Sequence, residues 1–394
     1  MTREVVFVGA ARTAIGSFGG SLKDVPPADL GALVIKTALE RAGVQPKDVG
    51  HVVMGHVIPS VPQDAYISRV ASLNAGVPQE APAFNVNRLC GSGLQAIVSA
   101  AQSILLGDCD VAVGAGAESM SRGAYLVTSN RWGARMGDVK MLDYMLGALH
   151  DPRMHIHMGI TAENVAARYD ITREQQDAYA AESQARAAKA IAAGIFKDQI
   201  VPVEIKTRKG VVLFDTDEGV KADTSVDTLA KMKPAFKKEE GTVTAGNAST
   251  LNDGAAAVVM ASAEKAKALG LKPLARLVAY GHAGVEPEYM GIGPVPASKA
   301  ALAKAGLTVA DLDVIESNEA FAAQACAVSK EMGFPADKTN PNGSGISLGH
   351  PVGATGAILV TKAIYELQRI NGRYALITMC IGGGQGIALI IERV

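Results

Sequence analysis

The sequence has no excess of charge and few cysteines. Its 38 lysines and arginines nearly balance its 39 aspartates and glutamates, so the formal net charge is −1. Without a basic excess, nucleic acid is not expected as the main partner. Four cysteines in 394 residues are too few for a disulfide framework. This usage fits a reducing compartment and predicts a cytoplasmic protein.

Hydrophobic segments that would cross a membrane are not predicted. The uncharged stretch Ala375–Ile391 is interrupted by the glycine-rich segment Gly382–Gly386. It is interpreted as two buried strands joined by a turn. The N-terminal residues lead directly into a predicted strand, so no signal peptide is expected. We therefore expect no membrane partner.

Motifs for nucleotides and metals are also missing. No G-x-G-x-x-G follows the first predicted strand and there is no Walker loop, so neither a dinucleotide-binding fold nor a P-loop is expected. His155 and His157 lie close together, but no third ligand has suitable spacing. The sequence therefore predicts no metal site.

An internal repeat is present. Ala38–Val44 and Ala301–Leu307 resemble each other at an offset of 263 residues. The same offset carries Gly93 onto Gly356, and each glycine opens an apolar helix-like segment followed by a strand. We interpret the pattern as two copies of one unit, in an α/β fold with sheets layered between helices. Chance similarity between alanine-rich helices is the alternative.

The length and the 48% hydrophobic content predict more than one domain with a well-buried core. The two copies would form the domains 1–120 and 251–394. Residues 121–250 fit neither copy and include the methionine-rich stretch Met141–Met158. We interpret them as an inserted lid that covers a ligand. Where the two copies pack together, equivalent loops would face each other and form a site.

Cys90 is the first candidate for chemistry. It precedes Gly91, Ser92 and Gly93 and then an apolar helix. The positive end of a helix dipole lowers a thiol pKa, so a reactive thiolate is expected there. A buried structural cysteine is the alternative, and it is the interpretation favoured for Cys109 and Cys326.

Two further residues complete a candidate set for acyl transfer. His350 lies in a glycine-rich turn, and the repeat places it opposite Asn87, near Cys90, whose proton it could accept. Cys380 follows a predicted strand. A thiol of near-ambient pKa could serve there as a general base. The N–H of Gly382 could help to bind an oxyanion.

Asn318 follows the predicted strand of the second copy. Its amide could polarise a carbonyl or hold a water molecule. Alternatively, it caps a helix that begins at Glu319. Local sequence favours the cap.

These motifs resemble one known family. In chain order they are NRLCGSG around Cys90, NEAFA at Asn318, SLGHPVGATG around His350 and CIGGGQG at Cys380. They closely resemble the motifs of thiolases, and the similarity extends over the whole chain. The chain looks most like bacterial biosynthetic acetyl-CoA acetyltransferases, including β-ketothiolases.

The resemblance implies a duplicated, five-layered αβαβα fold with an inserted lid. It implies an acetyl-CoA C-acetyltransferase that joins two acyl-CoA molecules reversibly into a 3-ketoacyl-CoA through an acyl-cysteine. CoA thioesters are then the substrates, no metal or prosthetic group is required, and the chain forms a homotetramer. The alternative within the family is a degradative 3-ketoacyl-CoA thiolase. A non-catalytic acyl-CoA-binding protein is the alternative outside enzymes.

The resemblance also assigns roles to residues. It makes Cys90 the nucleophile, His350 its base and Cys380 the second proton-transferring group, and it favours a catalytic Asn318 over a helix cap. Cys90, Gly382, His350 and Asn318 would form the oxyanion holes. The residues implied to bind substrate or CoA are His157, Lys221, Thr228, Ala245, Ser249, Met290 and Phe321.

The chain departs from the family pattern at two places. Lys221 stands where many members have an arginine, and a lysine makes no planar, bidentate contact there. Gly343–Gly345 reads Gly-Ser-Gly where many members have Gly-Gly-Ala. That pattern resembles ketothiolases with a broader range of acyl-chain lengths.

Overall fold

The structure is a computed structural model that describes residues 3–394. The strands of the first half are β1 (Val5–Arg12), β3 (His51–Gly55), β4 (Ala83–Val86), β5 (Val111–Ser119) and β10 (Asn252–Ser262). The helices of the first half are α1 (Pro27–Ala42), α2 (Ile67–Asn74) and α3 (Ser92–Leu106). Short elements beside them are β2 (Gly16–Ser17), η1 (Pro46–Asp48), η2 (Pro62–Tyr66) and α8 (Ala263–Ala268).

The second half repeats this series. Its strands are β11 (Ala275–Gly284), β12 (Val314–Ser317), β13 (Tyr374–Ile381) and β14 (Gln385–Arg393). Its helices are α9 (Pro294–Ala305), α10 (Ala322–Met332) and α11 (Thr355–Ile370), with the 3-10 segments η5 (Pro287–Ile292) and η6 (Val309–Asp311). The starts of α3 and α11, of β3 and β12, and of β5 and β13 are each 263 residues apart. The predicted duplication is therefore confirmed.

The matched helices begin and end for the same local reasons. Proline stands in the first turn of both α1 and α9, where its missing N–H has no partner to lose. Gly43 and Gly306 follow these two helices with φ of 67° and 66°. Glycine adopts this left-handed conformation at little cost, so both helices stop there.

The strand order is a near palindrome: β12-β13-β14-β11-β1-β10-β5-β3-β4. The two halves meet at β1 and β11, where, among residues 3–394, Val6 pairs with Arg276 and Phe7 pairs with Ala275. In the first half the parallel strands β4, β3 and β5 are followed by the antiparallel β10, and in the second half the parallel pair β12 and β13 is followed by the antiparallel β14. Parallel neighbours end at the same edge of the sheet, so the residues after β3 and β5 lie together, as do those after β12 and β13.

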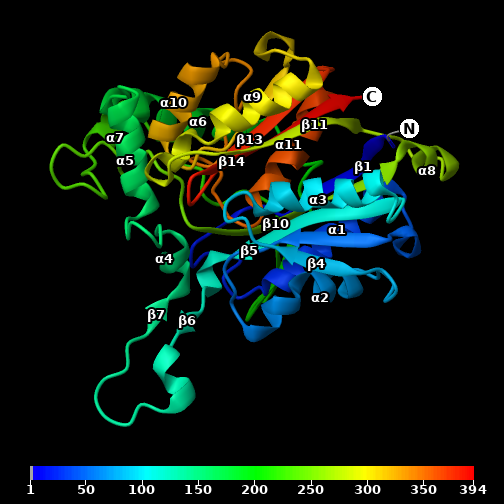
Figure 1. Cartoon of the computed structure of the whole chain (residues 1–394), viewed down its shortest axis with the longest axis horizontal. Coiled ribbons are helices and arrows are strands. Elements are labelled where there is room, and N and C mark those ends of the chain that lie inside the picture. The colour runs from blue at the N-terminus through cyan, green and yellow to red at the C-terminus, as the bar shows by residue number, and fades with distance from the viewer. Residues whose placement is uncertain (1–2) are drawn as a thin grey trace.

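Helices and strands form five layers. α1 and α2 cover the outer face of the first half, α9 and α10 cover that of the second, and α3 and α11 pack between the two halves (Figure 1). Three large hydrophobic clusters fill the spaces: one around α1, one around α3 and α11, and one around α9 and α10. The predicted αβαβα arrangement is confirmed. The segment Leu89–Leu106 is long and apolar enough to cross a membrane, but it contains α3, which packs in the central layer.

The two central helices cross at glycines. A Cβ atom on Gly93 would lie 2.9 Å from the backbone nitrogen of Ala357, and a Cβ on Gly356 would overlap the backbone nitrogen of Leu94. The contacts are reciprocal, as expected near a pseudo-twofold axis. Because the N-terminal ends of α3 and α11 approach so closely, the loops that precede them are brought together as well.

The predicted domain boundary at residue 250 does not agree with the strand pairing in the sheet. β10 pairs with β1 on one side and β5 on the other, so it belongs to the first half. In the second half, the matching strands β13 and β14 are joined by a short turn. The insertion lengthens this same connection in the first half, which is why the strand that completes the first sheet follows the insertion in sequence.

The insertion has several parts. Its elements are η3 (Met120–Arg122), β6 (Tyr125–Leu126), η4 (Thr128–Trp132), β7 (Leu142–Asp143), α4 (Tyr144–Ala148), α5 (Met158–Arg168), α6 (Arg173–Ala192), β8 (Val203–Thr207), β9 (Gly210–Phe214) and α7 (Val226–Ala230). α5 and α6 pack against α10. The segment 121–143, here called the arm, projects away from the body (Figure 1). The arm therefore does not act as the predicted lid.

Candidate active site

Cys90 lies in a strained turn before α3. The preceding residue, Leu89, has φ of 45°, which costs a residue other than glycine about 1 kcal/mol or more. The hydroxyl of Ser92 holds this turn: it accepts from the Arg88 N–H at 2.9 Å and donates to the Leu89 carbonyl at 2.6 Å. The turn places Cys90 just before the N-terminal end of α3, where α3 approaches α11.

The thiol of Cys90 is not pre-ionised, contrary to the expectation from the helix dipole. Burial raises its pKa to about 11, although hydrogen bonds from the backbone N–H groups of Gly382 and of Cys90 itself act in the opposite direction. The cost of placing a charge away from water exceeds what two N–H groups contribute. Cys90 therefore needs a base. The same two N–H groups lie beside the Cys90 sulfur, where donors of this kind are able to bind an oxyanion.

His350 is held by its own turn before α11. Gly349 has φ of 114°, and a Cβ atom there would lie 2.5 Å from the side-chain amide of Asn252. The oxygen of that amide accepts the His350 backbone N–H at 2.8 Å. Burial lowers the pKa of His350 to about 4, so its imidazole is neutral at pH 7 and able to accept a proton.

Thr355 determines which nitrogen of His350 accepts that proton. The imidazole Nδ1 lies 2.7 Å from the Thr355 hydroxyl, which donates its single hydrogen to the Pro351 carbonyl at 2.9 Å. Nδ1 must then carry the proton and donate to Thr355. The lone pair is left on Nε2, which lies 3.4 Å from the side-chain nitrogen of Asn318.

Asn318 is fully buried directly after β12. α10 begins only at Ala322 and its N-cap position is Phe321, so the alternative of a helix cap is wrong. The side-chain oxygen of Asn318 has no hydrogen-bond partner among the described residues. An amide with one free polar atom beside an imidazole is able to orient a water molecule or a substrate oxygen.

Cys380 lies at the end of β13, opposite Gly386 across the turn to β14. Gly383 and Gly384, with φ of 80° and 82°, make this turn. Burial, and then the nearby Cys90, raise the pKa of Cys380 far above its usual value, so the expectation of a near-ambient thiol is wrong. The two sulfurs are thus close enough for their charges to interact. A buried thiolate formed here would be a strong base.

One cavity of about 560 Å³ contains both Cys90 and His350 in its lining. A smaller cavity of about 220 Å³ adjoins it and shares Lys221 and Ala245. Six of the predicted substrate residues line the larger cavity: His157, Lys221, Ala245, Ser249, Met290 and Phe321. The remaining one, Thr228, lines the smaller cavity. Neither cavity is lined by Cys380, Asn318 or Gly382.

Other residues of the larger cavity were not predicted individually. They are mostly apolar, and among them are Met120, Met145, Leu146, Leu149, Met158, Phe236 and Val352. Several belong to the methionine-rich stretch of the insertion, so that composition was a usable signal. This part of the insertion forms part of the cavity wall.

His157 is fixed within the cavity wall. Its ring stacks on Phe236 with centroids 4.6 Å apart, and its Nδ1 accepts the Gly159 N–H at 2.9 Å. Burial, and then the charge of His150, lower the pKa of His157 to about 4. A neutral ring bonded in this way carries its proton on Nε2. Among residues 3–394, no three histidine, cysteine or carboxylate side chains are arranged to hold a metal ion.

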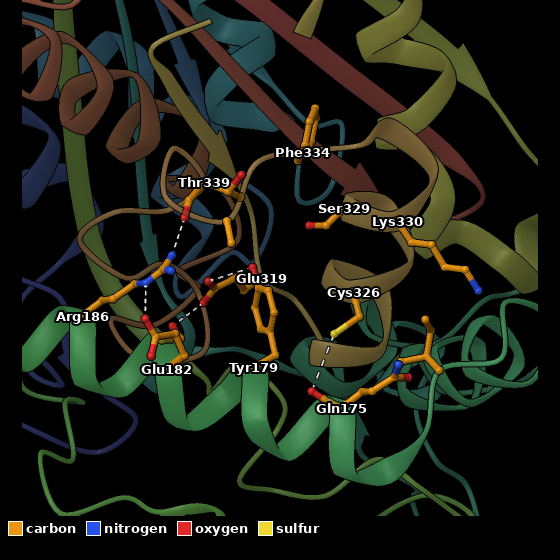
Figure 2. A pocket seen from close by; sticks show the side chains of 13 residues that line it. Gln175, Tyr179, Glu182, Arg186, Glu319, Cys326, Ser329, Lys330, Phe334 and Thr339 are labelled. Carbon is orange, nitrogen blue, oxygen red and sulfur yellow. Dashed lines mark hydrogen bonds and ion pairs between the residues drawn. The ribbon is translucent and has the colours of Figure 1, made fainter. Parts of the chain in front are cut away.

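A separate cavity of about 380 Å³ lies between α6 and α10 (Figure 2). Glu319 forms part of its wall, where Tyr179 donates at 3.3 Å and Ser183 at 2.6 Å to the two carboxylate oxygens. The only sulfur in the wall is that of Cys326, whose pKa is raised to about 12 by burial and by Glu319. Because no imidazole is among its lining residues, this cavity lacks the groups needed for acyl transfer. Its carboxylate instead accepts from the Asn340 side chain at 2.9 Å and from the Ile346 N–H at 3.3 Å, which fixes the residue that follows Asn318.

Comparison with known proteins agrees with this geometry. The N-terminal domain of thiolase matches residues 5–264 and the C-terminal domain of thiolase matches residues 271–393. The first match includes β10, as the sheet does.

Individual relatives match from end to end. Beta-ketothiolase BktB of Cupriavidus necator is 68% identical over 394 residues, which is 100% of both chains. Acetyl-CoA acetyltransferase of Bacillus anthracis has a TM-score of 0.97 at 47% identity, covering 100% of this chain and 99% of that one. Human mitochondrial 3-ketoacyl-CoA thiolase in complex with CoA has a TM-score of 0.96 at 44% identity, covering 100% and 98%. Since both family domains and the cysteine–histidine site occur in one continuous match, the chain belongs to the thiolase family.

Proposed function

We propose that this chain is an acetyl-CoA C-acetyltransferase, a β-ketothiolase that joins two acyl-CoA molecules reversibly into a 3-ketoacyl-CoA. The observation that carries the proposal is the shared cavity, in which Cys90 faces the same space as a neutral His350. A second thiol, that of Cys380, is buried near Cys90. The names of the relatives, beta-ketothiolase and acetyl-CoA acetyltransferase, support the same activity.

In the first half-reaction, Nε2 of His350 takes the proton of the Cys90 thiol. The thiolate attacks the acetyl carbonyl of acetyl-CoA, and the N–H groups of Cys90 and Gly382 bind the oxyanion. The carbon–sulfur bond to CoA then breaks. The departing CoA thiolate takes the proton of Cys380, which leaves an acetylated Cys90, a protonated His350 and a Cys380 thiolate.

In the second half-reaction, a second acyl-CoA enters and the Cys380 thiolate removes the proton from the carbon next to its carbonyl. Its high proton affinity in the buried site suits this step. The protonated His350 and a water molecule held by Asn318 stabilise the enolate. The enolate attacks acetyl-Cys90, the Cys90 thiolate leaves with the 3-ketoacyl-CoA released, and His350 returns the proton to Cys90.

The proposal is tested by separating the two half-reactions. After mixing with acetyl-CoA, mass spectrometry of the intact protein is expected to show an added acetyl group on Cys90. Cys90→Ser should lose this adduct. Cys380→Ser should still form it but fail to produce acetoacetyl-CoA. No adduct on the wild-type protein would reject the function, and full condensation by the Cys380 variant would reject its role.

The CoA moiety is proposed to occupy the two adjoining cavities, with the smaller one at the end far from Cys90. Lys221 would contact the CoA there as a point charge. The alternative, a degradative 3-ketoacyl-CoA thiolase, is supported by the likeness to the human mitochondrial enzyme. Steady-state rates with 3-ketoacyl-CoA substrates of increasing chain length decide between the two.

We also propose that the protein is a cytoplasmic homotetramer that requires no metal or prosthetic group. The thiols and the imidazole supply every proton transfer of the scheme above. The arm supports self-association, because it exposes apolar side chains that include Trp132 at 87% and Met136 at 97%. Such exposure on a projecting segment is typical of an interface.

A further inference from the structure

A buried ion pair lies next to the candidate site and has no role in the scheme above. Glu118 is near the end of β5, and His56 directly follows β3, its parallel neighbour. The His56 Nδ1 lies 3.2 Å from a Glu118 carboxylate oxygen and 2.9 Å from the Ala117 carbonyl. Both side chains are buried. The pair therefore sits where the ends of two central strands meet.

Glu118 must be ionised to make the contacts that it makes. One carboxylate oxygen accepts the N–H of Ile58 at 3.1 Å and faces His56. The other accepts the N–H of Val57 at 3.1 Å and that of Gly353 at 2.9 Å. All these partners are donors, so neither oxygen has room for a proton.

His56 carries the matching positive charge. Its Nδ1 must be protonated to donate to the Ala117 carbonyl, and its Nε2 lies 3.8 Å from the carboxylate of Asp64. Burial alone would lower the pKa of His56, but Glu118, the Ala117 carbonyl and Asp64 together raise it to about 9. The imidazolium thus lies between two carboxylates. These are the charged groups that face it from β5 and from the segment after β3.

This pair connects the two catalytic loops. Gly353, which donates to Glu118, is three residues after His350, and a Cβ atom on Gly353 would lie 2.6 Å from the Glu118 carboxylate. The negative charge of Glu118 also reaches Cys90, where it opposes ionisation of the thiol and raises its pKa. The carboxylate therefore holds the His350 loop in place but, left alone, would disfavour the Cys90 thiolate.

We propose that His56 is a positioning residue whose positive charge cancels that of Glu118, so that Glu118 fastens the His350 loop without an uncompensated anion beside Cys90. The inference rests on the proposed function, in which Cys90 reacts as a thiolate. It assigns His56 no contact with substrate.

The test is the pH dependence of Cys90 alkylation by iodoacetamide, using the full-length protein and locating the adduct on Cys90 by mass spectrometry. In His56→Gln the Glu118 charge is uncompensated, so below about pH 9, where His56 of the wild type is charged, the pH–rate profile should move to higher pH by about one unit. At a fixed pH in this range this is about a tenfold slower alkylation. His51→Gln, a change at the opposite end of β3 from His56, is the matched control and should leave the profile in place.

A second substitution separates charge from packing. Adding Glu118→Gln to His56→Gln removes the anion, and the profile should return toward that of the wild type. A purely structural role predicts no such reversal. An unchanged profile in His56→Gln, or no reversal in the double variant, overturns the inference.

Two controls keep the outcome interpretable. If His56→Gln does not fold, Glu118→Gln alone carries the test, because loss of the anion should move the profile to lower pH and an unmoved profile overturns the inference. Alkylation needs no acyl-CoA. Failure of wild-type Cys90 to be acetylated would therefore reject the proposed function separately from this result.

Discussion

At the scale of single residues, reactivity depends on how each group is hydrogen-bonded and buried. Cys90 and His350 both shift toward their neutral forms because burial disfavours charge. The pair is thus a thiol beside a free imidazole, and in the proposed mechanism proton transfer between them accompanies attack on the thioester. The Thr355 hydroxyl makes this possible by keeping the proton of the neutral imidazole on Nδ1.

Replacing Thr355 by valine removes the acceptor for the His350 Nδ1–H while keeping the side-chain shape. The unpaired nitrogen costs about 1–3 kcal/mol, so kcat should fall by about tenfold to hundredfold. Steady-state kinetics would measure this. The matched control is Thr361→Val in the same helix, since Thr361 also donates to a backbone carbonyl, that of Ala357, but lies away from the imidazole. Equal losses in both variants would contradict the role of Thr355.

At the scale of elements, the site depends on how closely α3 and α11 approach. Their glycines permit backbone contact at the helix starts, and the strand ends after β3 and β5 are joined by Glu118 and His56. The glycine contacts and the Glu118–His56 pair both hold loops that come from distant parts of the sequence. They should therefore affect stability as well as activity.

Gly356→Ala should destabilise the protein, although alanine is the better helix former by about 1 kcal/mol. The added Cβ would overlap the Leu94 backbone, which cannot yield without separating the two helices. We expect a net loss of about 2 kcal/mol in the free energy of unfolding, measured by urea denaturation. In the control Gly147→Ala, on α4, no atom lies within 4 Å of the new Cβ, so stability should be unchanged or higher. A stabilised Gly356 variant would show that the helices can separate freely.

The raised pKa of His56 predicts that the protein loses stability at alkaline pH. The pKa of His56 is about 9 in the folded protein and 6.5 in the absence of neighbours, so the folded state binds this proton more tightly. The resulting stabilisation, about 3 kcal/mol, is fully present below pH 6.5 and is lost as the pH rises through 9. Urea unfolding between pH 6.5 and 9.5 should show the decline, and His56→Gln should flatten it. The same slope in that variant would exclude His56 as its source.

At the scale of the whole molecule, a duplicated body carries one projecting arm (Figure 1). The body contains the whole candidate site, whereas the arm exposes Trp132 and Met136 to solvent. If the arm mediates the proposed self-association, this division separates it from catalysis. Each can then be altered without the other.

Replacing Trp132 and Met136 together by serine should reduce the oligomeric state, because the apolar surface proposed to drive association is lost. Light scattering coupled to size-exclusion chromatography would measure the mass. Acetylation of Cys90 should persist, since neither residue lines the cavity. An unchanged mass would place the interface elsewhere on the surface.

Much of the fold was predictable because the sequence features that indicate it are local or repeated. The offset of 263 residues predicted the duplication, and the order of motifs predicted the family. The place of β10 was not predictable, because a strand's partners lie far away in sequence and the insertion separates it from the half that it completes. The helix cap at Asn318 failed for a related reason, since the segment after β12 extends three residues further before α10 begins.

The sequence by itself determined which groups are present: two thiols and one imidazole, each beside glycines that allow tight turns, and one amide. Only the tertiary structure decided their protonation. Burial reverses the shift that the helix dipole favours at Cys90, and it raises the pKa of Cys380 instead of leaving it near neutral. Desolvation depends on every atom packed around a group, and those atoms come from both halves of the chain and from the insertion.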